Sequence, residues 1–98
     1  MKTIVVRYEA KAERADENQQ LIENVFAELE QLQPDGFTYK VFRLDDGVSF
    51  IHVMIEHDVD HHESLQDVPA FQAFVAEIDD RCQISPVAMG ATIVGGYR

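Results

Sequence analysis

The sequence has few basic residues, few cysteines and no long apolar run. Eight lysines and arginines stand against 18 aspartates and glutamates, giving a formal net charge of −10. A chain this acidic repels phosphate backbones and anionic membrane surfaces, so we expect no nucleic-acid partner and no membrane partner. Cys82 is the only cysteine, which excludes a disulfide within the chain and fits a reducing compartment. The sequence shows neither a membrane span nor the pattern of a signal peptide, so we expect a soluble cytoplasmic protein.

The apolar content is 46% over 98 residues. A chain of this size can bury a core without disulfides or metals, and no linker or repeat interrupts it. We therefore expect one domain, residues 1–98.

Hydrophobic periodicity divides the chain into strands and helices. Alternating apolar residues predict strands at 2–8, 37–44, 48–56 and 87–94. A capping box at Asp16 opens a first helix, which ends before Pro34. Asp67 is the expected N-cap of a second helix, whose apolar stripe runs from Phe71 to Cys82. The order strand, helix, strand, strand, helix, strand is typical of the ferredoxin-like βαββαβ fold of the α+β class, a four-stranded antiparallel sheet with two helices on one face.

The hairpin at 37–56 indicates how the two faces of this sheet differ. A three-residue turn with Gly47 in the left-handed conformation pairs Leu44 with Val48. On that register we expect the helices to cover Tyr39, Val41, Ile51, Val53 and Ile55, and the other face to carry Thr38, Lys40, Phe42, Phe50, His52 and Met54. An open, partly apolar face on a small protein signals an interface, so we expect a homodimer through the open sheet face.

Two short motifs carry a family resemblance that covers nearly the whole chain. Residues 34–37 read Pro-Asp-Gly-Phe before the second strand, and residues 68–74 read Val-Pro-Ala-Phe-Gln-Ala-Phe at the start of the second helix. With the element order, these motifs resemble the antibiotic-biosynthesis monooxygenase (ABM) branch of the dimeric α/β-barrel superfamily. The resemblance implies a ligand pocket between each protomer's sheet and helices, and an oxygenation that uses no bound cofactor. Haem-degrading members carry a tryptophan where this chain has Ile55, which argues against haem degradation here.

Aromatic and imidazole side chains are the candidates for ligand contacts in such a pocket. They are Tyr8, Tyr39, His52, His62, Phe71 and Phe74. Each also has a purely structural interpretation, since buried rings pack cores and a histidine on a strand can serve an interface. The sequence contains no nucleophile motif and no phosphate-binding loop, so no residue is assigned a catalytic role.

The segment 57–63 holds the densest group of potential metal ligands. His57, His61 and His62 could bind a metal, but the spacing lacks the paired ligands of structural zinc sites, and a solvated acidic loop is the preferred interpretation. Three hypotheses follow. The first is a homodimer that binds a small apolar or aromatic molecule and resembles cofactor-independent monooxygenases, with the specific reaction unknown. The second is a non-enzymatic binding or accessory module of the same fold, and the third is a metal-binding protein.

Overall fold

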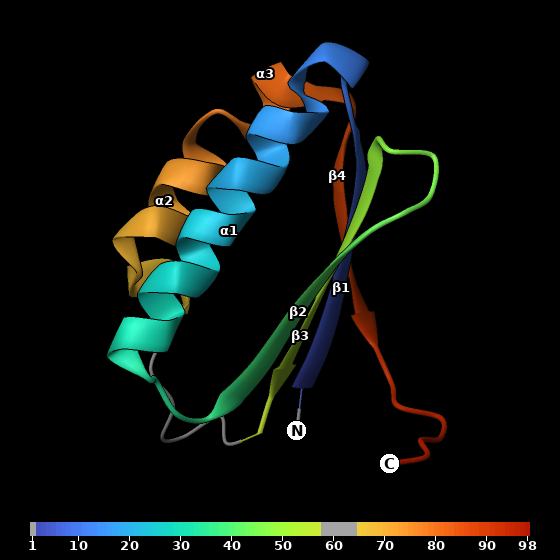
Figure 1. Ribbon diagram of the computed structural model, residues 1–98. Helices are drawn as coiled ribbons and strands as arrows, with labels where there is room; N and C mark the ends of the chain where they lie inside the picture. The colour runs from blue at the N-terminus through green and yellow to red at the C-terminus, as the bar shows by residue number, and fades with distance from the viewer. Residues whose placement is uncertain (1, 58–64) are drawn as a thin grey trace.

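The computed structural model describes residues 2–57 and 65–98, which form a sheet covered by helices on one face (Figure 1). The strands are β1 (Lys2–Ala10), β2 (Phe37–Arg43), β3 (Ser49–Glu56) and β4 (Cys82–Ala91). The helices are α1 (Ala15–Leu32), α2 (Pro69–Ala76) and α3 (Ile78–Arg81), with 3-10 turns η1 (Ala12–Arg14) and η2 (Leu65–Asp67). The strand order is β2-β3-β1-β4, and every neighbouring pair is antiparallel. The predicted ferredoxin-like α+β fold is confirmed.

The turn between β2 and β3 is one residue longer than predicted. The Leu44 amide donates to the Ser49 carbonyl at 2.8 Å, so Val48 belongs to the turn and does not pair with Leu44. Asp46 explains this arrangement, because its carboxylate accepts hydrogen bonds from the amides of Val48 and Ser49 and from the Ser49 hydroxyl. A shift of one residue in register moves every side chain of a strand to the opposite face of the sheet.

The predicted face assignment of β3 is therefore wrong. Val41 pairs with His52 and Tyr39 with Met54, so His52 and Met54 face the helices. Phe50 lies on the same face, is 1% exposed and stacks on Tyr8 with ring centroids 5.5 Å apart. The residues that sequence analysis placed under the helices, Ile51, Val53 and Ile55, lie on the open face instead. The buried apolar core consists of Tyr8, Ala10, Ala15, Ile22, Val25, Phe50, Leu65, Val68, Phe74 and Cys82.

The second predicted helix is divided into two short ones. Val68 is the N-cap of α2 and makes no side-chain cap bond, so Asp67 is not the cap. Glu77, with φ −128° and ψ 28°, separates α2 from α3. The last strand begins earlier than predicted, because the Lys11 amide donates to the Arg81 carbonyl at 2.7 Å and Cys82 pairs with Ala10. Cys82 is thus the first residue of β4, not the end of a helical stripe.

The start of the first helix also differs from the capping-box prediction. The helix begins at Ala15 and follows the turn η1, and its N-cap, Arg14, makes no side-chain cap bond. Asp16 lies in the first turn, where it pairs with Arg43 at 3.1 Å. Among the helices of residues 2–57 and 65–98, none is long and apolar enough to cross a membrane.

Replacing Phe50 tests the corrected register. We expect Phe50→Ala to lower the free energy of unfolding by about 3–5 kcal/mol, because a fully buried ring leaves a cavity. Phe42→Ala is the matched control, since Phe42 is 50% exposed and its loss within one protomer stays below about 1 kcal/mol. Urea unfolding at several protein concentrations separates folding from association, since only association depends on concentration. A Phe50→Ala loss that disappears on dilution would place Phe50 on the open face.

Candidate ligand-binding site

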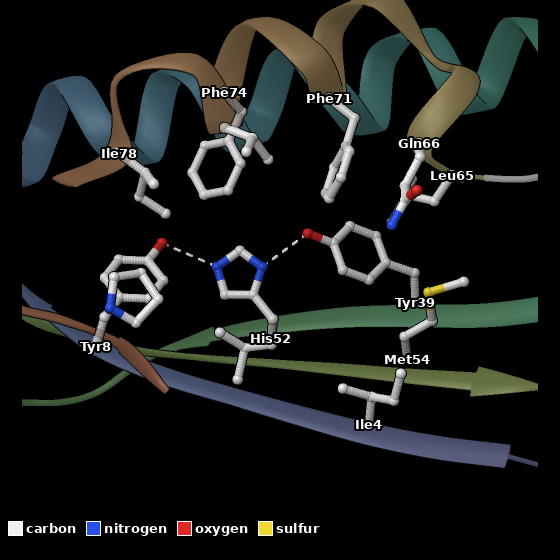
Figure 2. A pocket seen from close by; sticks show the side chains of 13 residues that line it. Ile4, Tyr8, Tyr39, His52, Met54, Leu65, Gln66, Phe71, Phe74 and Ile78 are labelled. Carbon is white, nitrogen blue, oxygen red and sulfur yellow. Dashed lines mark hydrogen bonds between the residues drawn. The ribbon is translucent and has the colours of Figure 1, made fainter. Parts of the chain in front are cut away.

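A cavity of about 270 Å³ lies between the helix-covered face of the sheet and α2–α3 (Figure 2). Alternate residues of the strands form its floor, and residues of η2, α2 and α3 form its roof. The lining residues are Ile4, Val6, Tyr8, Tyr39, His52, Met54, Leu65, Gln66, Phe71, Phe74, Val75, Ile78 and Pro86. Because most of them are apolar, the cavity suits a molecule with little polar surface.

The polar centre of the cavity is His52, held between two tyrosines. Its Nε2 lies 2.8 Å from the Tyr8 hydroxyl, and its Nδ1 lies 2.7 Å from the Tyr39 hydroxyl. Figure 2 shows the two hydroxyls meeting the imidazole from opposite sides. The three residues come from β1, β2 and β3, and the sheet register brings them together. Both ring nitrogens of a 6% exposed histidine are thereby hydrogen-bonded.

Two further buried polar side chains extend this network beyond the cavity. Asn18 of α1 donates its amide N–H to the Tyr8 hydroxyl at 2.8 Å. Arg81 donates from Nε to the Asn18 carbonyl oxygen at 3.1 Å, and from a terminal nitrogen to the Phe74 carbonyl at 2.5 Å. The Arg81 guanidinium also lies over the Phe74 ring, 5.2 Å from its centroid. A continuous chain of hydrogen bonds therefore runs from Arg81 to Tyr39.

Aromatic contacts fix the rings that surround His52. The His52 ring stacks on Phe74 with centroids 5.4 Å apart, and Phe71 meets the Tyr39 ring edge-on at 6.3 Å. Phe26 of α1 stacks on the other side of Tyr39 at 5.2 Å. Such contacts restrict the rotamers of both tyrosine and histidine, so the polar groups are held in place before any ligand arrives.

Burial keeps the ionisable groups of the cavity neutral. It lowers the pKa of His52 to about 4, because the charged imidazolium loses its hydration. Burial also raises the pKa of Tyr8, an effect that the hydrogen bond from Asn18 partly opposes. The pKa of Tyr39 is raised by burial first and by the neighbouring Tyr8 second. At neutral pH the cavity thus offers uncharged hydrogen-bonding groups.

The structure brings together the candidates of the sequence analysis with one exception. Tyr8, Tyr39, His52, Phe71 and Phe74 all line the cavity, whereas His62 lies outside the described residues. His52 reaches the cavity only because of the corrected register, since sequence analysis had placed it on the open face. Whether these residues bind a ligand stays a prediction.

Sequence reasoning missed Asn18 and Arg81, although the spacing contains a signal for both. Asn18 precedes the buried Ile22 by four residues, so it continues the apolar stripe of α1. Arg81 follows Phe74 by seven residues, a spacing that puts both on one face of the single helix that the sequence predicts there. A polar residue at an apolar stripe position indicates a buried polar contact, because burying it alone would be costly.

The metal-binding hypothesis gains no support from the part of the chain that the structure describes. Residues 2–57 and 65–98 contain no group of three or more histidine, cysteine, aspartate or glutamate side chains placed to hold a metal ion. His57 lies 2.6 Å from the Thr38 hydroxyl through its Nε2. His61 and His62 lie outside the described residues.

Comparison with known proteins gives similarity in structure only. No protein-family model and no curated protein sequence matches the chain. Among solved structures, Rv0793 from Mycobacterium tuberculosis superposes with a TM-score of 0.73 at 10% identity, covering 99% of this chain and 98% of that one. An antibiotic biosynthesis monooxygenase superposes with a TM-score of 0.70 at 14% identity, covering 97% of this chain and 100% of that one. SnoaB, a cofactor-independent oxygenase from Streptomyces nogalater solved in a mutant form, superposes with a TM-score of 0.69 at 15% identity, covering 97% of this chain and 94% of that one. The chain therefore has the fold of the ABM-type structures, as the resemblance in its sequence indicated.

Proposed function

We propose that this chain is a small-molecule-binding homodimer of the ABM type whose cavity takes an apolar or aromatic ligand. The observation that carries the proposal is the apolar cavity on which Tyr8, Tyr39 and His52 converge. Its volume of about 270 Å³ is near the lower end of the range for ligand sites, so a molecule of one or two fused rings is the expected size.

The arrangement of aliphatic side chains favours this proposal over an accessory module with a closed pocket. A closed pocket would require large aliphatic residues such as Ile51 and Val53 between the sheet and the helices. The register places both on the opposite face, paired with Phe42 and Lys40 of β2. Phe74 stands in the wall of the cavity and leaves its centre open.

A cavity of this kind also suits oxygenation by O2 without a bound cofactor, the chemistry that the sequence resemblance implies. An electron-rich aromatic substrate supplies the electrons itself. For a dihydroxynaphthalene, one oxygen atom of O2 enters the ring to give a hydroxynaphthoquinone, and the other leaves as water with two hydrogens of the substrate. The neutral hydroxyl and imidazole groups would position such a substrate. SnoaB, which shares the fold, is described as a cofactor-independent oxygenase.

The open face of the sheet supports the homodimer. Pairs across the strands place Val5 beside Val53 and Met89, and Phe42 beside Ile51. Phe42, Val87 and Met89 are 50%, 58% and 67% exposed. With the corrected register this face is more aliphatic than sequence analysis supposed, so a second copy of the sheet would bury more apolar area. The cytoplasmic location and the single domain over residues 1–98 stay predictions from composition.

Ligand binding and oxygenation can be measured with 1,5-dihydroxynaphthalene. We expect the fluorescence of this compound to change when it binds. Ile78→Trp should raise its dissociation constant at least about tenfold, since the indole would occupy the cavity. Val94→Trp is the control, because Val94 is 99% exposed. Oxygen uptake with quinone formation would support the monooxygenase. Binding without oxygen uptake would support the accessory module, and equal binding by both tryptophan variants would contradict this cavity as the site.

Charge on the open face tests the dimer. We expect Phe42→Lys to give monomers in sedimentation velocity, since an ammonium group cannot be buried between two apolar sheets without a partner. Leu32→Lys should leave the dimer intact, because Leu32 is similarly exposed, at 55%, but lies on α1. A Phe42→Lys protein that remains dimeric would place the interface elsewhere.

The low pKa of His52 predicts how stability depends on pH. The pKa falls from 6.5 to about 4 on folding, so the unfolded chain takes up the proton first as the pH drops. The stabilisation from neutral His52 is complete above pH 6.5 and is lost between pH 6.5 and about 4, at up to about 1.4 kcal/mol per pH unit.

Urea unfolding across this pH window checks the prediction. His52→Gln should flatten the slope relative to the parent chain, because the substituted side chain no longer takes up a proton in this pH range. An NMR titration of His52 in the unaltered protein measures the pKa directly. An ordinary value for that pKa would show that the imidazole is not buried as described.

A further inference from the structure

Arg81 fixes the direction of the hydrogen-bond chain that ends in the cavity. A guanidinium can only donate, so the atom 3.1 Å from its Nε must be the carbonyl oxygen of Asn18. The amide nitrogen of Asn18 then donates to the Tyr8 hydroxyl oxygen at 2.8 Å. The orientation of the amide, which is ambiguous in many side chains, is determined here by a neighbour that cannot accept.

The same reasoning gives the direction of the hydrogen bond between Tyr8 and His52. Tyr8 is 2% exposed, and its single hydroxyl proton has two neighbours, Asn18 and His52. Since Asn18 donates, the proton must go to Nε2 of His52. Either direction leaves one tyrosine proton without an acceptor in the described residues, and the reverse direction would leave it on Tyr8, which is more deeply buried than the half-buried Tyr39. An unpaired proton costs more free energy at the more buried site. A neutral histidine that accepts at Nε2 carries its own proton on Nδ1.

The series of hydrogen bonds ends at Tyr39, whose hydroxyl proton is not used within the series. The Nδ1–H of His52 donates to the Tyr39 hydroxyl oxygen at 2.7 Å, which leaves the Tyr39 proton free to point elsewhere. Within residues 2–57 and 65–98, His52 is the only hydrogen-bond partner found for this hydroxyl. Tyr39 lines the cavity, and the stacked Phe26 and the edge of Phe71 hold its ring there.

We propose that Tyr39 determines specificity by donating its hydroxyl proton to an acceptor oxygen of the ligand, so that the cavity selects apolar or aromatic molecules that carry a carbonyl or a similar acceptor. This inference rests on the proposed small-molecule function and narrows its ligand class. Apart from the Gln66 amide, the rest of the cavity wall supplies apolar contact, and the direction of the hydrogen bonds between Tyr8, His52 and Tyr39 leaves a donor, not an acceptor, at Tyr39. Burial raises the pKa of Tyr39, so the hydroxyl keeps the proton that it donates.

A matched pair of ligands tests the proposal. 1-Tetralone and tetralin are two-ring molecules of nearly equal shape, and only the first has an acceptor oxygen. We expect the ratio of their dissociation constants to shift toward tetralin by about 3- to 10-fold in Tyr39→Phe, the effect of one net hydrogen bond. Tyr97→Phe should leave the ratio unchanged, because Tyr97 is 85% exposed.

A second test reverses the direction of these hydrogen bonds by a substitution at Asn18, which does not line the cavity. Asn18→Asp keeps the shape of the side chain but replaces its donor with an acceptor, so Tyr8 must donate to Asp and accept from His52. The His52 proton should then move from Nδ1 to Nε2, and Tyr39 should donate to Nδ1 instead of to the ligand. Imidazole ¹⁵N shifts at pH ~8, where an ordinary histidine is neutral, report the tautomer. Asn24→Asp on the exposed side of α1 is the control.

The outcomes separate this inference from the proposed function. Three results together would support the inference. The His52 proton lies on Nδ1 in the parent chain, it moves to Nε2 in Asn18→Asp, and the preference for the ketone is lost in both Tyr39→Phe and Asn18→Asp. A proton on Nε2 in the parent chain, or a ligand ratio unaffected by Tyr39→Phe, would overturn it while leaving the binding function standing. Failure of both ligands to bind the parent chain would overturn the small-molecule function together with this inference.

Discussion

The burial of Arg81 is the constraint on which the arrangement of helices and cavity depends. Its side chain is 2% exposed, and a buried charge is tolerated only when its donors are satisfied. Neutral groups meet this requirement here, namely the carbonyl oxygens of Asn18 and Phe74 and the face of the Phe74 ring. These contacts join α1, α2 and α3 at one point. The same guanidinium orients Asn18, so a single buried charge both holds the helices together and sets the direction of the hydrogen bonds that reach the cavity.

The second constraint is the Asp46 turn, which decides what the cavity contains. With three residues in the turn, Ile51 and Val53 would face the helices and His52 would face outward. The hydrogen bonds from the amides of Val48 and Ser49 to Asp46 make the turn longer by one residue. His52 then lies between Tyr8 and Tyr39, and the aliphatic side chains move to the open face. The polar centre of the cavity and the apolar character of the opposite face therefore have a common local cause.

The fold could be predicted from the sequence because its main signals are local and redundant. Periodicity, the turn at Pro34 and the segment that begins at Val68 all indicated the same order of elements. The hairpin register could not be predicted, because both faces of β3 are partly apolar and the hydrophobic pattern fits either choice. The end of the second helix was missed because the pairing of Cys82 with Ala10 is a contact between distant parts of the chain. Asn18 and Arg81 follow helical spacing, but their partnership is set only by tertiary packing.

The corrected register also changes what the family resemblance implies for chemistry. Haem-degrading members of the branch that this sequence resembles carry a tryptophan near the end of the third strand. The residue at that place by simple counting, Ile55, lies on the open face here. The neighbouring residue that does line the cavity is Met54, a flexible thioether with no hydrogen-bond donor. The polar groups that line this cavity are those of His52, Tyr8, Tyr39 and Gln66. Structures that share the fold at 10 to 15% identity show how the chain is folded, while the direction of the hydrogen bonds in the cavity follows from how Arg81, Asn18 and Tyr8 orient the proton of His52.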